Sequence, residues 1–227
     1  MDKHYTYLLI NFFTLFFPVA LSFDRRVAFF KSWKSIFPGL AITGLLFLIW
    51  DYIFTLYNVW SFNAGYIVNV YFLNLPVEEI LFFITVPFAC IFIYECLNCY
   101  LSESIFSRLS TAISVGLLFL SVILLVFFYP RVYSVITFAL VSILSIFLLI
   151  KRPRYLGRFY RAFLVSLIPF YLVNGILTAI PVVMYNDAQS SGIRVGTIPL
   201  EDHFYSLAMF LMNIILFEYF RNRRGRA

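Results

Sequence analysis

The sequence predicts an all-α integral membrane protein with about seven transmembrane helices, and three observations support that class. Of the 227 residues, 63% are hydrophobic and only 12% are charged, whereas soluble domains carry roughly 25% charged residues. Apolar runs of about 20 residues, long enough to cross a hydrocarbon core ~30 Å thick, recur along the chain. These runs do not alternate apolar and polar residues, as the strands of a membrane β-barrel do.

Seven segments are predicted to span the membrane as helices. They lie at residues 5–23, 39–57, 77–93, 109–129, 132–150, 162–183 and 203–217. We interpret the first as a retained helix and not as a signal peptide, because its apolar run is long and Ala20 and Ser22 form a poor cleavage site.

Positive charge is concentrated on one side of the predicted membrane domain. The connections after the first, third and fifth helices, together with the C-terminal tail, hold 14 of the 17 Lys and Arg residues. Because such charge favours the cytoplasmic side of the cell membrane, we expect the N-terminus outside and the C-terminus in the cytoplasm. We interpret the basic tail RNRRGR as a topological anchor, and we expect no nucleic-acid partner.

The two halves of the chain repeat each other at an offset of 123 residues. The matched pairs are Pro76 with Pro199, Glu78 with Glu201, Glu79 with Asp202, Phe82 with Tyr205, Glu95 with Glu218 and, upstream, Asp51 with Asn174. A chain that crosses the membrane three times ends on the side opposite its start. A fourth, linking helix is therefore needed before the second repeat can begin on the same side of the membrane as the first. We therefore expect two parallel three-helix repeats, at residues 1–100 and 131–227, joined by a linking helix at residues 101–130.

Each repeat carries two adjacent acids directly after a proline, at a predicted helix start. Proline and acids are common in first helical turns, so simple helix-end chemistry is one interpretation. We favour a functional interpretation because the pattern occurs twice and because Asp51 lies at a similar depth. Acids within membrane spans are costly and typical of functional sites.

The connection at residues 58–75 has no charged residue and is rich in aromatic side chains. It is longer than most connections between helices. We interpret it as folded back onto the membrane, either as a lid over a site or as part of an interfacial aromatic belt.

The residue types exclude some chemistries and favour one. Asp-rich diphosphate motifs and the G-x-G-x-x-G fingerprint are absent, and Cys96 and Cys99 form a lone C-x-x-C, so we expect neither a metal nor a cofactor. Acid chemistry on an apolar substrate fits better, because neighbouring buried carboxyl groups resist ionising together and one can hold its proton. A carbocation would then need a dry site with aromatic ring faces. The candidate substrate-binding residues are Trp50, Tyr52, Phe82, Phe83, Asn174, Phe204 and Tyr205.

These motifs resemble the carotenoid (lycopene) cyclase domain. The resemblance lies in two membrane repeats, each with Pro-x-Glu-Glu or Pro-x-Glu-Asp at a helix start, and in the Trp50-Asp51 pair upstream of the first. It implies a lycopene β-cyclase, an isomerase of the intramolecular lyase type that converts lycopene through γ-carotene to β-carotene in carotenoid biosynthesis. The implied partners are lycopene, the lipid bilayer and other enzymes of carotenoid synthesis.

The same resemblance assigns roles to the acids. Glu78 is expected to protonate the terminal double bond of the substrate, with Glu79 as its partner or as the base. Glu201 and Asp202 carry the motif in the second repeat, and Asp51 orients or shares the proton.

The alternative function is a proton-coupled transporter for small molecules, because intramembrane acids also relay protons. Against it, the helix-interior prolines Pro87 and Pro169 have Phe210 and Leu46 at the repeat-related positions, so the helix breaks that transporters use are not paired.

Overall fold

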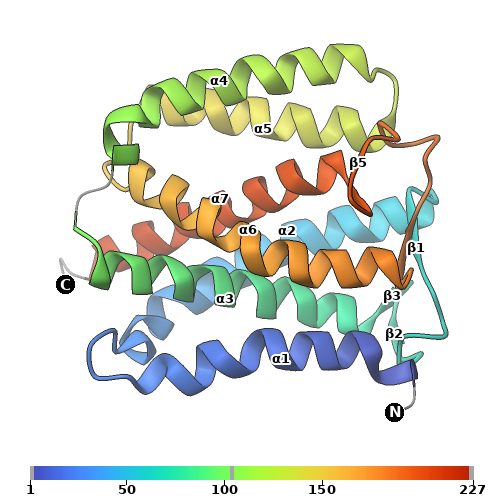
Figure 1. Cartoon of the computed structure of the whole chain (residues 1–227), viewed down its shortest axis with the longest axis horizontal. Helices are drawn as coiled ribbons and strands as arrows, with labels where there is room; N and C mark the ends of the chain where they lie inside the picture. Colours follow the sequence, from blue (N-terminus) through green and yellow to red (C-terminus); the bar gives the residue numbers. More distant parts are fainter. Residues whose placement is uncertain (1–2, 103–104, 225–227) are drawn as a thin grey trace.

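The computed structural model describes residues 3–102 and 105–224, and these residues form a bundle of seven long α-helices (Figure 1). The helices are α1 (Thr6–Ala20), α2 (Trp33–Leu56), α3 (Val77–Tyr100), α4 (Ile105–Phe127), α5 (Val132–Lys151), α6 (Leu156–Ala179) and α7 (Leu200–Arg224). Short 3-10 helices lie at Lys3–Tyr5, Leu21–Phe23 and Phe29–Ser32. Each of the seven long helices is long and apolar enough to cross a membrane, which confirms the predicted fold class.

Several helices extend beyond the predicted spans. α2 begins at Trp33, before the predicted residue 39, and α7 continues to Arg224, beyond the predicted residue 217. Hydropathy marks only the apolar middle of a span, whereas the helix continues through polar residues in the interface. The segment 162–183 was predicted too long at its C-terminal end, because α6 ends at Ala179 and Val183 already belongs to a strand.

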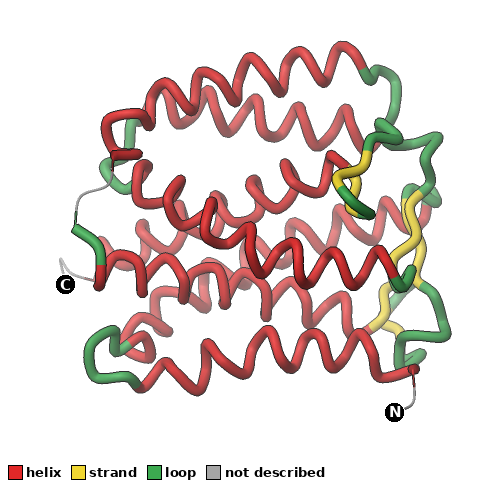
Figure 2. Tube along the Cα trace, in the orientation of Figure 1, coloured by secondary structure: helices red, strands yellow, loops and turns green. Residues whose placement is uncertain are grey.

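Six short strands gather at one end of the bundle (Figure 2). They are β1 (Trp60–Phe62), β2 (Tyr71–Phe72), β3 (Leu75–Pro76), β4 (Val183–Tyr185), β5 (Arg194–Val195) and β6 (Ile198–Pro199). β2 pairs with β3, and β5 with β6, each as a hairpin just before α3 or α7. The aromatic connection 58–75 is therefore partly folded into short strands at this end of the bundle.

The third pair, β1 with β4, joins the two repeats. It is antiparallel, with Ser61 opposite Met184. These two residues are related by the repeat offset of 123, so the ladder is centred on equivalent positions. Two further backbone hydrogen bonds follow the same relation, Asn63 N–H to Val182 O and Asn186 N–H to Val59 O, both 2.9 Å long. An antiparallel ladder with this register has the symmetry of a twofold rotation, as parallel repeats in one membrane require.

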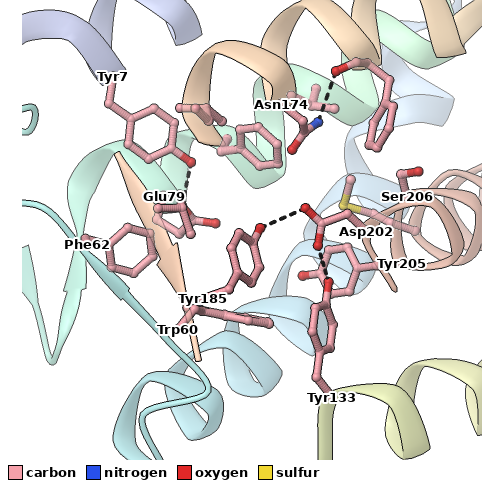
Figure 3. A pocket seen from close by; sticks show the side chains of 16 residues that line it. Tyr7, Trp60, Phe62, Glu79, Tyr133, Asn174, Tyr185, Asp202, Tyr205 and Ser206 are labelled. Atoms are coloured by element: carbon pink, nitrogen blue, oxygen red, sulfur yellow. Dashed lines mark hydrogen bonds between the residues drawn. The ribbon is translucent and has the colours of Figure 1, made fainter. Parts of the chain in front are cut away.

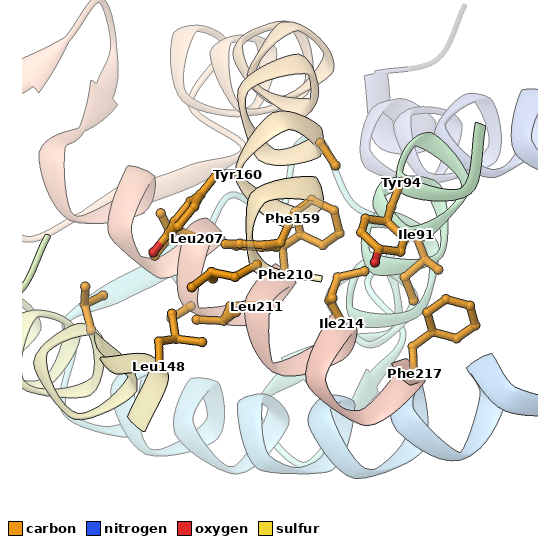
Figure 4. Packing of buried hydrophobic residues seen from close by; sticks show 14 of the residues in the cluster. Ile91, Tyr94, Leu148, Phe159, Tyr160, Leu207, Phe210, Leu211, Ile214 and Phe217 are labelled. Atoms are coloured by element: carbon orange, nitrogen blue, oxygen red, sulfur yellow. The ribbon is translucent and has the colours of Figure 1, made fainter. Parts of the chain in front are cut away.

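The helices of the two repeats interleave in the core. α2 packs against α7, and α6 packs against α3, so each repeat places its second helix on the third helix of the other repeat. Phe210, Ile214 and Phe217 of α7 lie in the same buried cluster as Tyr94 of α3 and Phe159 of α6 (Figure 4). α4 lies outside this arrangement, against α5 and α6. The acid-bearing helices α3 and α7 are thus both central.

Candidate active site

A small cavity of about 70 Å³ lies at the strand end of the bundle, between the two repeats. Glu79 of α3 and Asp202 of α7, which are repeat mates, both line it. Most of the remaining wall is aromatic. The aromatic lining residues are Tyr7, Trp60, Phe62, Phe82, Tyr133, Phe170, Tyr185 and Tyr205.

Glu79 lies in the first turn of α3, where Pro76 precedes the helix with an extended backbone. It accepts a hydrogen bond at Oε2 from the hydroxyl of Tyr7 on α1 (Figure 3). Both side chains are buried, with Tyr7 1% and Glu79 8% exposed. Among the described residues, Tyr7 is the one hydrogen-bond partner of the Glu79 carboxyl, which leaves Oε1 for a group in the cavity.

Asp202 occupies the equivalent position on α7, but both of its oxygens are engaged. The hydroxyl of Tyr133 donates to Oδ1 at 2.6 Å, and the hydroxyl of Tyr185 donates to Oδ2 at 2.8 Å (Figure 3). Tyr185 belongs to β4, outside the membrane spans, and burial raises the pKa of its phenol well above the usual value, with the nearby Asp202 carboxylate adding to the effect. Tyr185 therefore stays protonated and remains a donor to Asp202.

Glu78 and Glu201, the first acid of each pair, do not line this cavity. Glu78 accepts a hydrogen bond at Oε1 from the backbone N–H of Val68 at 2.6 Å. Glu201 accepts hydrogen bonds from the backbone N–H and the hydroxyl of Ser191 and from the hydroxyl of Ser134. Both acids are fully buried. Each binds the loop before its own helix, because neighbouring residues on a helix point about 100° apart.

Asp51 of α2 does not line the cavity but contacts a residue that does. Its Oδ1 accepts a hydrogen bond from the indole N–H of Trp60, and Trp60 lines the cavity. The ring of Trp60 lies 5.1 Å from that of Tyr133, centroid to centroid. Asp51 is 1% exposed, and its Oδ2 has no hydrogen-bond partner in the described parts of the chain.

Comparison of the sequence with known protein families identifies the family of this chain. The family model described as lycopene cyclase matches residues 4–97 and 130–220, a range in each half that includes both acid pairs. The chain belongs to the lycopene cyclase family. Neither a curated protein nor a solved structure matches the chain.

Membership of the lycopene cyclase family bears on the sequence predictions. It confirms the resemblance, and it implies a cyclase enzyme with lycopene as substrate. The matched ranges and the seven apolar helices agree with an integral membrane protein built from two repeats. The transporter alternative finds no support in this family.

Three of the predicted substrate-binding residues line the cavity. They are Phe82, Asn174 and Tyr205. The other four lie outside its lining. Trp50 packs behind Tyr205 at 5.1 Å between ring centroids, Phe83 packs against Phe47, Phe204 against Phe138, and Tyr52 is half-buried on α2.

Sequence reasoning missed eleven of the sixteen lining residues, among them the polar aromatic residues Tyr7, Trp60, Tyr133 and Tyr185. One signal was present for two of them. Tyr7 and Tyr133 stand near the starts of corresponding helices, α1 and α5, and each donates a hydrogen bond to the second acid of its own repeat. The two tyrosines are 126 residues apart, so the offset of 123 places Tyr7 opposite Pro130, and only a repeat shifted by three residues in its first helix pairs them.

Few groups at the site suit a metal ion or an anionic group. No cluster of three or more His, Cys, Asp or Glu side chains that could hold a metal ion occurs within residues 3–102 and 105–224. The described lining contains no Lys, Arg or His. The polar groups of the lining are carboxyl groups, phenols, one amide, one serine hydroxyl and one indole N–H, set among aromatic ring faces.

Proposed function

We propose that this chain is a lycopene β-cyclase that closes β-rings on the ψ-ends of lycopene, forming γ-carotene and then β-carotene without redox change. The observation that carries the proposal is the pair of carboxyl groups, Glu79 and Asp202, on one small and largely aromatic cavity. Acid, base and ring faces are the groups that a cation-mediated cyclisation of a hydrocarbon requires.

The proposed reaction conserves atoms and electrons. Glu79 donates its proton to the terminal double bond of the ψ-end, which leaves a tertiary carbocation. The next double bond of the same end attacks this cation, forms the ring C–C bond and moves the positive charge into the ring. Asp202 removes a ring proton, and the electron pair of that C–H bond becomes the ring double bond. One proton enters and one leaves, so the reaction is an isomerisation by an intramolecular lyase.

The hydrogen bonds support Glu79 as the acid and Asp202 as the base. Donors to a carboxylate favour its charged form, and Asp202 receives two phenol donors where Glu79 receives one. Two carboxyl groups that share a small, buried cavity also resist ionising together. We therefore assign the proton donor to Glu79 in place of Glu78, whose carboxyl binds the loop backbone at Val68. For Glu78 and Glu201 we propose a positioning role.

The aromatic wall supports the cationic steps. Trp60, Tyr205 and Phe82 line the cavity, and ring faces attract a cation by about 0.5–2 kcal/mol each, with the larger values in desolvated sites. Asn174 also lines the cavity. Its repeat mate in the first half is Asp51, which does not line the cavity. Because an amide does not cycle protons, we propose one working site with unequal contributions from the two repeats.

We further propose the division into repeats at residues 1–100 and 131–227, with residues 101–130 as the linking helix. The charge distribution supports an N-terminus outside the cell and a cytoplasmic C-terminus. The cavity would then lie near the outer face of the membrane.

Expression in bacteria that accumulate lycopene tests the proposed acid. The wild-type chain should convert the pigment to β-carotene, and Glu79→Gln should lower conversion by about 10²-fold or more, because a general acid contributes about 10²–10⁴-fold. Glu78→Gln is the matched control, since a glutamine Oε1 can still accept the Val68 N–H bond. The readout is carotenoid chromatography, normalised to the amount of membrane-inserted protein. Near-normal β-carotene from Glu79→Gln, with loss in Glu78→Gln, would restore Glu78 as the acid.

A further inference from the structure

A second and larger cavity, of about 550 Å³, runs along the bundle beside the acid cavity. We call it the α1–α6 groove, because α1 and α6 form its walls. Ile10 and Phe17 line it from α1, Leu167 and Val173 from α6, and Ala89 from α3, which lies between those helices (Figure 1). None of its described lining residues is charged.

The α1–α6 groove adjoins the acid cavity. Five residues line both spaces, namely Val86, Phe170, Asn174, Ser206 and Met209. The two spaces therefore adjoin across these side chains. Asn174 and Ser206 are the polar members of this shared wall.

The groove is long and lies within the predicted hydrocarbon region. On α1 its lining runs from Thr6 to Pro18, which is about 18 Å of helix at about 1.5 Å per residue. On α6 it runs from Phe163 to Ile176, which is about 20 Å by the same measure. A hydrocarbon core is ~30 Å thick, so the groove extends over more than half of that depth.

Prolines within three helices line the groove. They are Pro18 of α1, Pro87 of α3 and Pro169 of α6. A proline inside a helix removes one backbone hydrogen bond and bends the helix. The repeat mates of Pro87 and Pro169 are Phe210 and Leu46. Pro87 and Pro169 therefore have no proline counterpart in the other repeat, and the one further helix-interior proline of the described helices, Pro38 of α2, does not line the groove.

We propose that the α1–α6 groove binds the polyene chain of the substrate while its ψ-end lies between Glu79 and Asp202. This inference rests on the proposed function. A linear hydrocarbon with a reactive end needs a small acidic site for that end and a long apolar site for the rest of the chain. The acid cavity and the α1–α6 groove are two such sites, and they lie next to each other at Asn174. A resident lipid acyl chain would need only the apolar space.

Groove-filling substitutions test this proposal. Ala89→Phe fills the groove from α3, and Thr14→Phe fills it from α1. Ala41→Phe on α2 is the matched control, because Ala41 is exposed and does not line the groove. Each purified protein in liposomes is given lycopene or a shortened acyclic polyene with the same ψ-end. Both groove variants should lose about tenfold or more in kcat/KM for lycopene, since a lost apolar subsite discriminates by about 10–200-fold.

The shortened polyene distinguishes the groove from the acid cavity. It should be cyclised by both groove variants within about twofold of wild type, because its chain ends before the filled segment. Wild-type rates with lycopene in both variants would overturn the proposal, and would point to a lipid as the occupant. Equal losses with the two substrates would overturn it too, because the damage would then lie in the acid cavity. Neither result bears on Glu79 as the acid, which the Glu79→Gln experiment decides separately.

Discussion

Each Pro-x-acid-acid motif gives its two carboxyl groups different surroundings. Pro76 precedes α3, so Glu78 and Glu79 both fall in its first turn. A turn of about 100° between neighbours sends one carboxyl to the loop and the other to the cavity. Asp202 is the cavity-facing acid of the second motif. Helical phase, and not residue type, thus separates the proposed chemical role from the proposed positioning role.

Asp51 provides a test of positioning against proton transfer. Its Oδ1 accepts a hydrogen bond from the indole N–H of Trp60, and an asparagine oxygen can accept the same hydrogen bond. Asp51→Asn should therefore lower the cyclisation rate by less than about tenfold, whereas Asp51→Leu should lower it further, because a buried donor without a partner costs about 1–3 kcal/mol. Purified enzyme assayed with lycopene, together with the fluorescence of Trp60 in a Trp33→Phe, Trp50→Phe background, gives the measurement. If Asp51→Asn and Asp51→Leu lose activity equally while the Trp60 signal is unchanged in Asp51→Asn, then Asp51 transfers a proton.

The acids of the site could be predicted because ionisable residues are rare in this chain, whereas the tyrosines could not. With 16 Tyr and 29 Phe residues, an aromatic side chain near an acid carries little information. Tyr133 meets Asp202 from 69 positions away in sequence. That contact depends on how α5 packs against α7, which no local pattern determines. The repeat at its offset of 123 pairs Tyr7 with Pro130, so it did not reveal Tyr133 either.

At the scale of elements, the acid-bearing helices α3 and α7 are each fastened to a preceding hairpin. β2–β3 leads into α3, and β5–β6 leads into α7. Glu78 and Glu201 bind backbone N–H groups of these connections, at Val68 and Ser191. The strands were not predicted, because segments of two or three residues have no readable alternation. The aromatic composition of residues 58–75 indicated only that the connection returns to the membrane.

The hairpin attachment predicts a local loss of order when one of these acids is removed. Glu201→Ala leaves the N–H and hydroxyl of Ser191 and the hydroxyl of Ser134 without their acceptor, at about 1–3 kcal/mol for each buried group. Hydrogen exchange should therefore quicken across residues 186–199. Asp187→Ala in the same loop is the control. Asp187 is largely exposed, and its ion pair with Arg194 contributes at most about 1 kcal/mol. Unchanged exchange in Glu201→Ala would show that the strands hold this loop without the acid.

At the scale of the whole molecule, the site exists only where the two repeats meet. Glu79 comes from one half and Asp202 from the other, and the β1–β4 ladder crosses between them at the same end. At the opposite end, Arg221 of the second half binds the carboxyl groups of Glu95 and Glu218, which are repeat mates. The offset of 123 residues predicted two similar halves. The exchange of α2 and α6 between them could not be predicted, because a repeat in sequence does not determine which surfaces of its copies pack together.

This interleaving predicts how the protein behaves when the chain is divided. We expect residues 1–102 and 103–227, expressed together as separate polypeptides in lycopene-accumulating cells, to restore β-carotene. The contacts of α2 with α7 and of α3 with α6 are tertiary and do not need the connection between α3 and α4. Either half alone should form no ring, because it carries one cavity-facing acid and leaves β1 or β4 without its partner strand. Glu79→Gln in the first half should abolish the restored activity, which separates true reassembly from activity of the second half. β-Carotene made by the second half on its own would contradict a site shared between the repeats, and would place both acid and base within residues 103–227.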